Sequence, residues 1–310
     1  MHRVFGLSGS VWAALLSVYI FWGGTYLAGR FALETIPPMV VTSARFLVAG
    51  VLLYIVESLR GWERTGWKGW RDAAISGFFL LCLGNGALVW AQQYIPSGIA
   101  AIILGITPMW LVLLSCLMQK GPRPNGLVWS GLVLGFTGIA LLAKDAATEQ
   151  GGNYLFGACL VMGCSFFWAL GSVCSRMAKQ PRRPLQWVAM QTLSGGGLLL
   201  AAALFTGQWQ KFDPTLLSLK SLGGIMYLIF CGSLLGYASY IWLLNNAPAS
   251  LAATYAYVNP LVAVLVGWLF AGETMGTREA LAAAVIITAV ILITIGNGRN
   301  TARNPHPHQR

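Results

Sequence analysis

The feature that most constrains this chain is a series of apolar runs, each about 20 residues long and separated by short polar loops. A helix rises 1.5 Å per residue, so a run of about 20 residues crosses a bilayer core of about 30 Å. Charged residues make up 9 % of the chain, against about 25 % in a soluble domain. The sequence therefore predicts an all-α polytopic membrane protein with ten transmembrane helices, at roughly 11–30, 38–58, 72–93, 97–118, 126–144, 154–176, 185–206, 221–244, 250–270 and 278–296.

Two of these runs carry a proline near their middle. Pro108 lies in the fourth run, and Pro260 lies 152 positions later in the ninth. A proline inside a helix removes a backbone donor and pushes against an earlier carbonyl, so both helices are expected to kink or break within the membrane. Paired interruptions in two halves indicate a transporter with its site at the midplane, and both prolines become hinge candidates. The alternative is that they only shape helix packing.

The two halves of the chain also match in their first two runs. At a shift of 146 positions, Trp22 falls on Trp168 and Pro38 falls on Pro184. Five spans per half is an odd number, so the halves must have opposite orientations in the membrane. We therefore expect two inverted five-helix repeats, over residues 1–145 and 146–296, followed by a disordered cytoplasmic tail over 297–310.

The basic residues predict the orientation. With the N-terminus in the cytoplasm, fourteen Lys and Arg lie in inner segments and five in outer ones, so both termini are expected inside. The net charge of +11 therefore belongs to short loops, and no nucleic acid is expected as a partner. The six cysteines lie within apolar runs without metal-type spacing, and we expect no metal and no cofactor.

Catalytic constellations are missing from the apolar runs. No His lies in any predicted span, and every Asp and Glu falls in a loop or near a span end. Intramembrane catalysis needs a nucleophile with a base, a carboxylate pair or a metal cluster, so we do not expect an enzyme. A channel would need a selectivity ring, and no charged ring is visible. A scaffold without transport would leave the paired prolines unexplained.

Polar and aromatic residues instead form stripes at helical spacing. Such side chains at membrane depth face the protein interior or a water-filled path, and aromatic rings with polar tips suit an apolar solute that also forms hydrogen bonds. The alternative is an interfacial aromatic belt, and Trp62, Trp67, Trp70 and Trp209, which lie near span ends, are expected to belong to it. The candidates for substrate binding are Trp22, Tyr26, Asn85, Trp168, Tyr237, Tyr240, Tyr255 and Asn259.

Arg45 is the one charge well inside a predicted span. A buried Arg costs at least about 2.5 kcal/mol on insertion scales, so it needs a partner. It either binds a substrate carboxylate or holds freed carbonyls or Glu273 in a structural role, and we favour the structural role.

Two groups of glycines have a simpler interpretation. Gly84 and Gly86 lie inside an apolar run and indicate close packing or a hinge. Gly131, Gly135 and Gly138 form a small-residue seam that is typical of helix packing. The seam serves packing within one chain or between two copies, so a homodimer stays open.

Several motifs together resemble the EamA family of the drug/metabolite transporter superfamily, and within it a group of inner-membrane proteins. The resemblance implies ten helices in two inverted repeats, cytoplasmic termini and export of small metabolites, with amino acids the best-known cargo of related members. The family's acidic residue after the fourth helix of a repeat is present as Glu273, whereas Gly121 occupies the matching position in the first repeat. The motifs are Tyr19–Tyr26, Pro37-Pro38, Arg45–Leu47, Gly84–Gly86, Pro96–Ala101, Trp168–Ser172, Ala253–Pro260 and Gly272–Thr274.

These observations together predict a bacterial inner-membrane secondary transporter. It would export small neutral or zwitterionic metabolites, amino acids first, by alternating access between the repeats. Its expected partners are the lipid bilayer and the metabolite. Other cargo (a sugar, nucleoside, polyamine, drug or cationic dye) and, less favoured, a channel are the alternatives. No acid or His lies at mid-membrane, so we expect weak or no obligatory proton coupling, although Glu34 and Glu273 lie near the outer surface.

Overall fold

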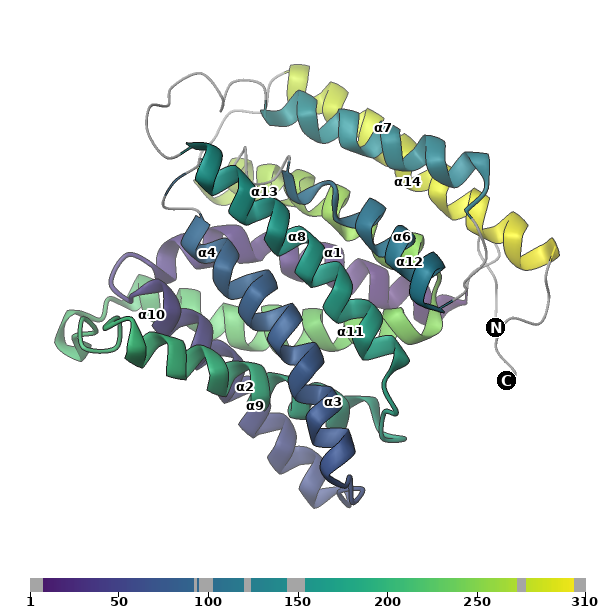
Figure 1. Ribbon diagram of the computed structural model, residues 1–310. Helices are drawn as coiled ribbons and strands as arrows, with labels where there is room; N and C mark the ends of the chain where they lie inside the picture. The colour runs from purple at the N-terminus through teal and green to yellow at the C-terminus, as the bar shows by residue number, and fades with distance from the viewer. Residues whose placement is uncertain are drawn as a thin grey trace.

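The computed structural model describes residues 8–91, 94, 103–119, 124–143, 154–271 and 277–303, and every regular element within them is a helix (Figure 1). The elements are α1 (Gly9–Ala32), α2 (Pro38–Leu59), α3 (Trp67–Gly77), the π-helix η1 (Phe78–Gly86), α4 (Ala87–Ala91), α6 (Thr107–Gln119), α7 (Gly126–Ala143), α8 (Tyr154–Met177), α9 (Pro184–Phe205), the 3₁₀-helix η2 (Pro214–Leu216), α10 (Leu219–Tyr227), the π-helix η3 (Leu228–Tyr237), α11 (Ala238–Asn246), α12 (Ala249–Ala252), α13 (Tyr255–Ala271) and α14 (Thr277–Arg303).

The long helices coincide with the predicted spans. Within the described residues, six helical stretches are long and apolar enough to cross a membrane, and three shorter apolar helices accompany them. α2 and α9 agree with their predicted spans to within one residue at each end. Each begins at a proline, which suits a first helical turn because the N–H that proline lacks would be unpaired there.

The C-terminal helix is longer than predicted. α14 continues to Arg303, seven residues into the segment that we expected to be a disordered tail. Pro305 is the first proline after this helix, and a proline disfavours helical geometry in the residue before it. Asn and Gly between 297 and 300 therefore did not end the helix, and the tail prediction is wrong over 297–303. Residues 304–310 lie outside the described part.

Two of the predicted spans contain a π-helix in their middle. η1 separates α3 from α4, and η3 separates α10 from α11. A π-helix has hydrogen bonds from residue i to i+5, usually lasts a single turn and is frequent at functional sites. Here the π-helices are nine and ten residues long. They occupy the same place in each half of the chain, and neither is predicted by the apolar runs of the sequence.

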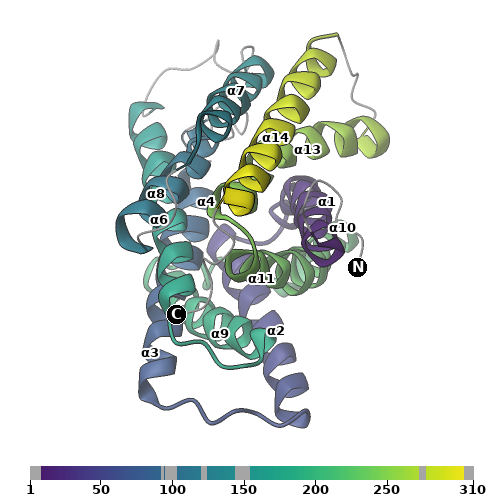
Figure 2. The ribbon, with the colours of Figure 1, turned by 90° about the vertical axis from the view of Figure 1, so that its right-hand side faces the viewer.

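The helices pack in a reciprocal pattern. α1 lies against α10, η3, α11 and α13, whereas α8 lies against α3, η1, α4 and α6. α2 packs along α9, and α7 runs beside α14 at the top of the bundle (Figures 1 and 2). The first helix of each half therefore contacts the third and fourth helices of the other half, so neither half forms its core alone.

Glycines allow the helices of these pairs to approach closely. A Cβ atom at Gly50 of α2 or at Gly196 of α9 would lie 2.9 Å from a backbone nitrogen of the facing helix. On α7, Gly131 and Gly138 face side chains of α14, and Gly135 faces a ring of α13. The predicted small-residue seam therefore packs helices within one chain.

The helix interruptions do not lie at the prolines. In the second half the break is at residues 253–254, between α12 and α13, six residues before Pro260. Backbone hydrogen bonds from i to i−3 tighten the chain there, and Pro260 lies inside α13. In the first half a turn at residues 105–106 precedes α6, and Pro108 is the second residue of that helix. A proline in a first turn removes no intrahelical bond, so in both halves the helix break of the described residues lies before the proline rather than at it.

Candidate functional site

Four of the predicted site residues form one aromatic cluster. Trp22 of α1 has ring centroids 5.6 Å from Trp168 of α8, 5.2 Å from Tyr240 of α11 and 4.9 Å from Tyr255 of α13. Tyr240 lies 5.7 Å from Trp168 and 5.3 Å from Tyr255. Trp22, Tyr240 and Tyr255 are buried, and Trp168 is partly buried. Residues far apart in the sequence thus converge at the centre of the bundle.

The polar tips in this aromatic cluster are anchored. Trp22 donates from Nε1 to the carbonyl of Gly232 at 2.9 Å. Trp168 donates from Nε1 to the hydroxyl of Tyr240 at 3.2 Å, and that hydroxyl lies 2.6 Å from Oγ of Ser172. Buried indoles and phenols usually find such partners. The rings are therefore held in position by hydrogen bonds as well as by packing.

Each tryptophan of the cluster rests on a glycine of a π-helix. A Cβ at Gly236 of η3 would lie 2.5 Å from Nε1 of Trp22. A Cβ at Gly84 of η1 would lie 3.0 Å from Cε3 of Trp168. Real Cβ atoms are scarcely found closer than 3.0 Å to another heavy atom, so Trp22 could not keep its position if residue 236 had a side chain. The contact at Gly84 is tight, and a Cβ there would require Trp168 to give by a few tenths of an ångström. The two irregular helices and the aromatic cluster form one unit.

Tyr237 does not join the aromatic cluster. Its hydroxyl donates to Oε1 of Gln191 at 3.1 Å, and Nε2 of Gln191 donates to Oγ of Ser76 and of Ser175 at 2.7 and 3.0 Å. Tyr237 is the last residue of η3, where i→i+5 bonding changes the angle between successive side chains. The predicted stripe with Tyr240 assumed α-helical spacing. Sequence reasoning missed this buried network, although a glutamine in an apolar run was a visible signal.

The remaining predicted binding residues are less connected. Asn259 of α13 is buried, and its Oδ1 finds no hydrogen-bond partner among the described residues. Asn85 of η1 is partly buried and forms no side-chain hydrogen bond within the described residues. Tyr26 belongs to α1, but its side chain lies outside the described part. Asn259 follows Tyr255 by one helical turn, so its free acceptor lies next to the aromatic cluster.

The helix break before α13 is held against α1. The hydroxyls of Tyr19 and Thr254 lie 2.5 Å apart, and both residues are buried. Thr254 also donates to the carbonyl of Leu251 at 2.7 Å. Thr254 therefore connects the break both to α12, which precedes it, and to α1.

Arg45 contacts the π-helix η3. Its Nε donates to Oγ of Ser233 at 3.1 Å, and Ser233 donates in turn to the carbonyl of Leu228 at 3.1 Å. Its guanidinium carbon lies 4.7 Å from the ring centroid of Phe46. No carboxylate of the described residues forms an ion pair with Arg45. Glu273, the partner considered from the sequence, lies outside the described residues.

Comparisons with known proteins decide the class of this molecule. The profile of the EamA-like transporter family matches residues 7–144 and 155–295. The chain belongs to the EamA-like transporter family. The predicted membership is confirmed, and both the family description and the names of relatives indicate a transporter rather than an enzyme. Within the described residues, no three His, Cys, Asp or Glu are grouped as a metal site requires.

Known transporters align with this chain over about nine tenths of their length. It is 36 % identical over 290 residues to the uncharacterized inner membrane transporter YedA of Escherichia coli K12, covering 92 % of this chain and 91 % of YedA. It is 25 % identical to the uncharacterized transporter YvbV of Bacillus subtilis, covering 90 % of each chain. A solved structure described only as a crystal structure of a protein superposes with a TM-score of 0.78 at 19 % identity, covering 95 % of this chain and 99 % of the other. At that identity the match concerns the fold alone.

Proposed function

We propose that this EamA-family chain is a multi-pass inner-membrane transporter that exports small neutral or zwitterionic metabolites, amino acids first, by alternating access between two inverted repeats. The observation that carries the proposal is the aromatic cluster between the halves. In it, Trp22 and Trp168 meet 5.6 Å apart, and each rests on a glycine of a π-helix from the other half. Motion of either π-helix would move a tryptophan and so change access at the centre.

Several features support two repeats over residues 1–145 and 146–296. The family profile matches twice, α1 and α8 are both 24 residues long, and α2 and α9 are both 22 residues long. The reciprocal packing of the first helices also favours this division. Residues 9–32 and 154–177 would then run in opposite directions across the bilayer, as repeats with an odd number of spans require.

Contacts between loops support the predicted orientation. Loops 60–66 and 178–183 are both expected in the cytoplasm, and they touch: Oε2 of Glu63 accepts from the backbone N of Arg182 at 2.8 Å. Gln186 bonds the backbone N and O of Glu63 at 3.0 and 2.8 Å. Two loops on one side of the membrane are consistent with an even number of spans between them, and cytoplasmic termini follow from the charge count.

The chemistry of the centre favours a solute with an apolar side chain and an ammonium group. Indole and phenol rings provide an apolar surface with hydrogen-bonding edges. The Oδ1 atom of Asn259 is a buried acceptor without a partner in the part of the chain that the structure describes, and such an acceptor costs about 1–3 kcal/mol until a donor arrives. A substrate ammonium group supplies such a donor. Tyr255, one turn earlier on α13, would contact the side chain of the same solute.

The helix irregularities replace the prolines as the proposed hinges. η1 and η3 lack the α-helical bond pattern, and residues 253–254 interrupt the path from α12 to α13. Pro108 follows the turn at residues 105–106 by two residues, and Pro260 follows the break at residues 253–254 by six. Each proline would limit how far the irregular segment before it extends, since neither donates a backbone hydrogen bond. Arg45, bonded to Ser233 of η3, would hold that π-helix in place, which is the structural role favoured from the sequence.

The test is counterflow in proteoliposomes loaded with a panel of unlabelled amino acids, with entry of labelled threonine, methionine and phenylalanine as the readout. We expect accumulation of at least one. For that amino acid, an analogue that lacks the ammonium group should compete poorly with the wild type. Asn259→Ala should abolish this discrimination, whereas the matched variant Asn246→Ala, at an exposed amide bonded to a carbonyl of its own helix, should retain it.

Folded protein that accumulates none of the panel would overturn the amino-acid assignment and move the cargo to sugars, nucleosides, polyamines or drugs.

We also propose that transport has no obligatory proton coupling. Among the described acids of the long helices, Glu57 is buried, but it lies near the end of α2 with Arg60 and Arg183 each 3.7 Å away. Uphill flux driven by a proton gradient and abolished by an uncoupler would contradict this.

A further inference from the structure

A groove of about 350 Å³ opens on the side of the helix bundle, between α3 and α9. That volume lies within the range of ligand pockets, about 300–1,000 Å³. It takes no part in the central aromatic cluster and lies at the end of the bundle that carries loop 60–66. Its lining residues are Trp67, Trp70, Arg71, Ala74 and Ser194.

The groove runs from the membrane surface inward. Trp67 begins α3 and is 80 % exposed, which places the mouth of the groove at the end of the helix. Ser194 is the eleventh residue of α9, so it lies about 15 Å along that helix, half the depth of a bilayer core. A Cβ at Gly77 would lie 2.7 Å from the carbonyl of Gln191, so the two helices that border the groove are in close contact there.

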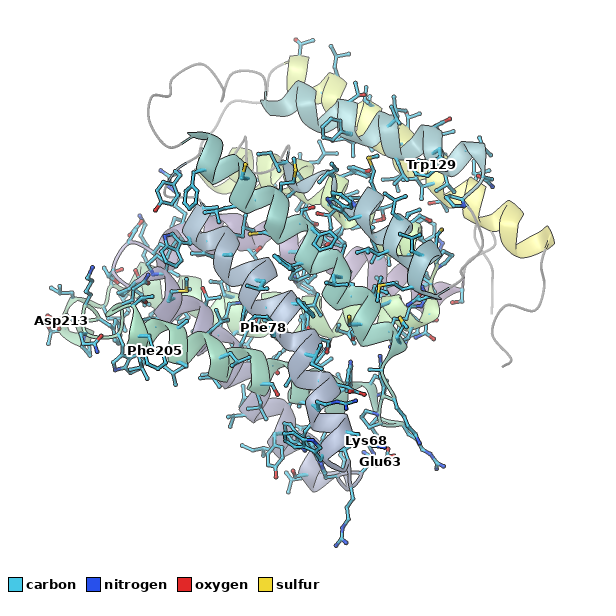
Figure 3. The ribbon with its side chains drawn as sticks, in the orientation of Figure 1. Glu63, Lys68, Phe78, Trp129, Phe205 and Asp213 are labelled. Carbon is cyan, nitrogen blue, oxygen red and sulfur yellow. The ribbon has the colours of Figure 1, made fainter. Side chains whose placement is uncertain are left out.

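The mouth of the groove is cationic, whereas its depth is apolar. Arg71 donates from Nε and Nη2 to Oδ1 of Asp72 at 3.1 and 2.9 Å, which leaves its Nη1 group without a partner among the described residues. Its side chain is 53 % exposed. Lys68 is exposed one turn earlier and projects from the lower end of the bundle in Figure 3. Deeper in the groove, Trp70 and Ala74 offer mainly apolar surface.

Aromatic rings fix the depth of this mouth in the membrane. Trp62 and Trp70 stack with ring centroids 6.3 Å apart and planes at 21°, and Tyr54 lies 4.7 Å from Trp62. Tryptophan and tyrosine concentrate at the level of lipid headgroups. The aromatic belt expected from the sequence therefore places Lys68 and Arg71 where lipid phosphates lie.

We propose that this groove binds one anionic phospholipid, with its phosphate held by Arg71 and Lys68 and an acyl chain lying along Trp70, Ala74 and Ser194. Basic pockets between membrane helices recognise anionic headgroups by charge. A soluble phosphate would use only the mouth, and a zwitterionic lipid would gain little from two cations. The groove and its charges together therefore favour a whole anionic lipid. This inference does not depend on the identity of the cargo.

The test is native mass spectrometry of the full chain in detergent, titrated with phosphatidylglycerol or with phosphatidylcholine of the same acyl chains. We expect one phosphatidylglycerol to be retained in preference to phosphatidylcholine. Arg71→Gln should lower the association constant about fivefold, because one Lys or Arg near an anionic surface contributes about 1 kcal/mol. Asp72→Asn should raise it, since Arg71 is then free. Lys211→Gln, an exposed cation of loop 206–218, is the matched control and should change nothing.

A second pair of variants tests the acyl chain. Ala74→Phe fills the groove and should reduce retention of the lipid, and Ser194→Leu does the same from α9 should the first variant fail to fold. The inference is overturned by equal retention of the two lipids, or by equal effects of Arg71→Gln and Lys211→Gln. It is also overturned if soluble glycerophosphoglycerol displaces the lipid at equal concentration, because the groove would then bind a headgroup only.

Discussion

Replacing Gly236 by alanine should destabilise this protein, although alanine is the better helix former. The new Cβ would lie 2.5 Å from Nε1 and 2.6 Å from Cδ1 of Trp22. That indole is packed against three other rings and donates to the carbonyl of Gly232. It is a rigid bicyclic ring without a flexible end that can yield, so the ring or the π-helix must shift.

The magnitude follows from three opposing terms. Inserting a methyl group into a packed interior costs about 1–3 kcal/mol. Displacing the indole leaves a buried donor without its partner, which costs about 1–3 kcal/mol more. Alanine in place of glycine recovers about 1 kcal/mol of helix propensity. We therefore expect Gly236→Ala to lower the free energy of unfolding by about 1–5 kcal/mol.

The assay is thermal unfolding in detergent, read as the fraction of protein that stays monodisperse after heating. Gly223→Ala is the matched control, since a Cβ there meets nothing within 4 Å, and its Tm should be unchanged or higher. Gly84→Ala, with a closest contact of 3.0 Å, should fall between the two. Replacing Trp22 by leucine first should reduce the cost of Gly236→Ala. The reasoning is refuted if Gly236→Ala melts at or above Gly223→Ala.

Three further results are expected. Tyr240→Phe removes a hydroxyl that bonds both Trp168 and Ser172, and it should cost about 1–3 kcal/mol of stability in the same melting assay, whereas Tyr54→Phe at an exposed ring should be neutral. Arg45→Lys loses the bond to Ser233 and should reduce protein abundance; full abundance with a selective loss of transport for carboxylate-bearing solutes would instead make Arg45 a substrate ligand. Hydrogen bonds from Thr215 lower the pKa of Asp213. The stabilisation of the turn by the Asp213 carboxylate is therefore fully present above the ordinary pKa of an aspartate, and it is lost as the pH falls through the lowered pKa. An NMR titration that gives Asp213 an ordinary pKa would contradict this.

The positions of the helices were predictable because a bilayer imposes length and polarity. A proline at the first residue and about 20 apolar residues after it specify α2 and α9 almost to the residue. The break at residues 253–254 was not predictable from Pro260, because a proline limits where a helix continues without fixing where it bends. The π-helices leave no mark on hydropathy, since an apolar run satisfies i→i+4 and i→i+5 bonding alike.

The candidate site was predictable in part. Trp22, Trp168, Tyr240 and Tyr255 were chosen because rings with polar tips recur at helical spacing, and the structure brings these four together. Tyr237 was grouped with them on α-helical spacing, which η3 does not follow. The partners of its hydroxyl lie on other helices, and a single sequence holds no information about which distant helix faces which.

The two π-helices also bear on how the sequence tolerates insertion and deletion. A π-turn holds more residues than an α-turn, so losing one residue from η1 can be absorbed by a return to α-helical bonding, with α4 kept in phase. The same loss from the middle of α9 would rotate everything after it by about 100° and turn Gly196 away from α2. Length variation among natural or engineered relatives should therefore be found in the middle of these two membrane helices as well as in the loops, and be absent from α2 and α9.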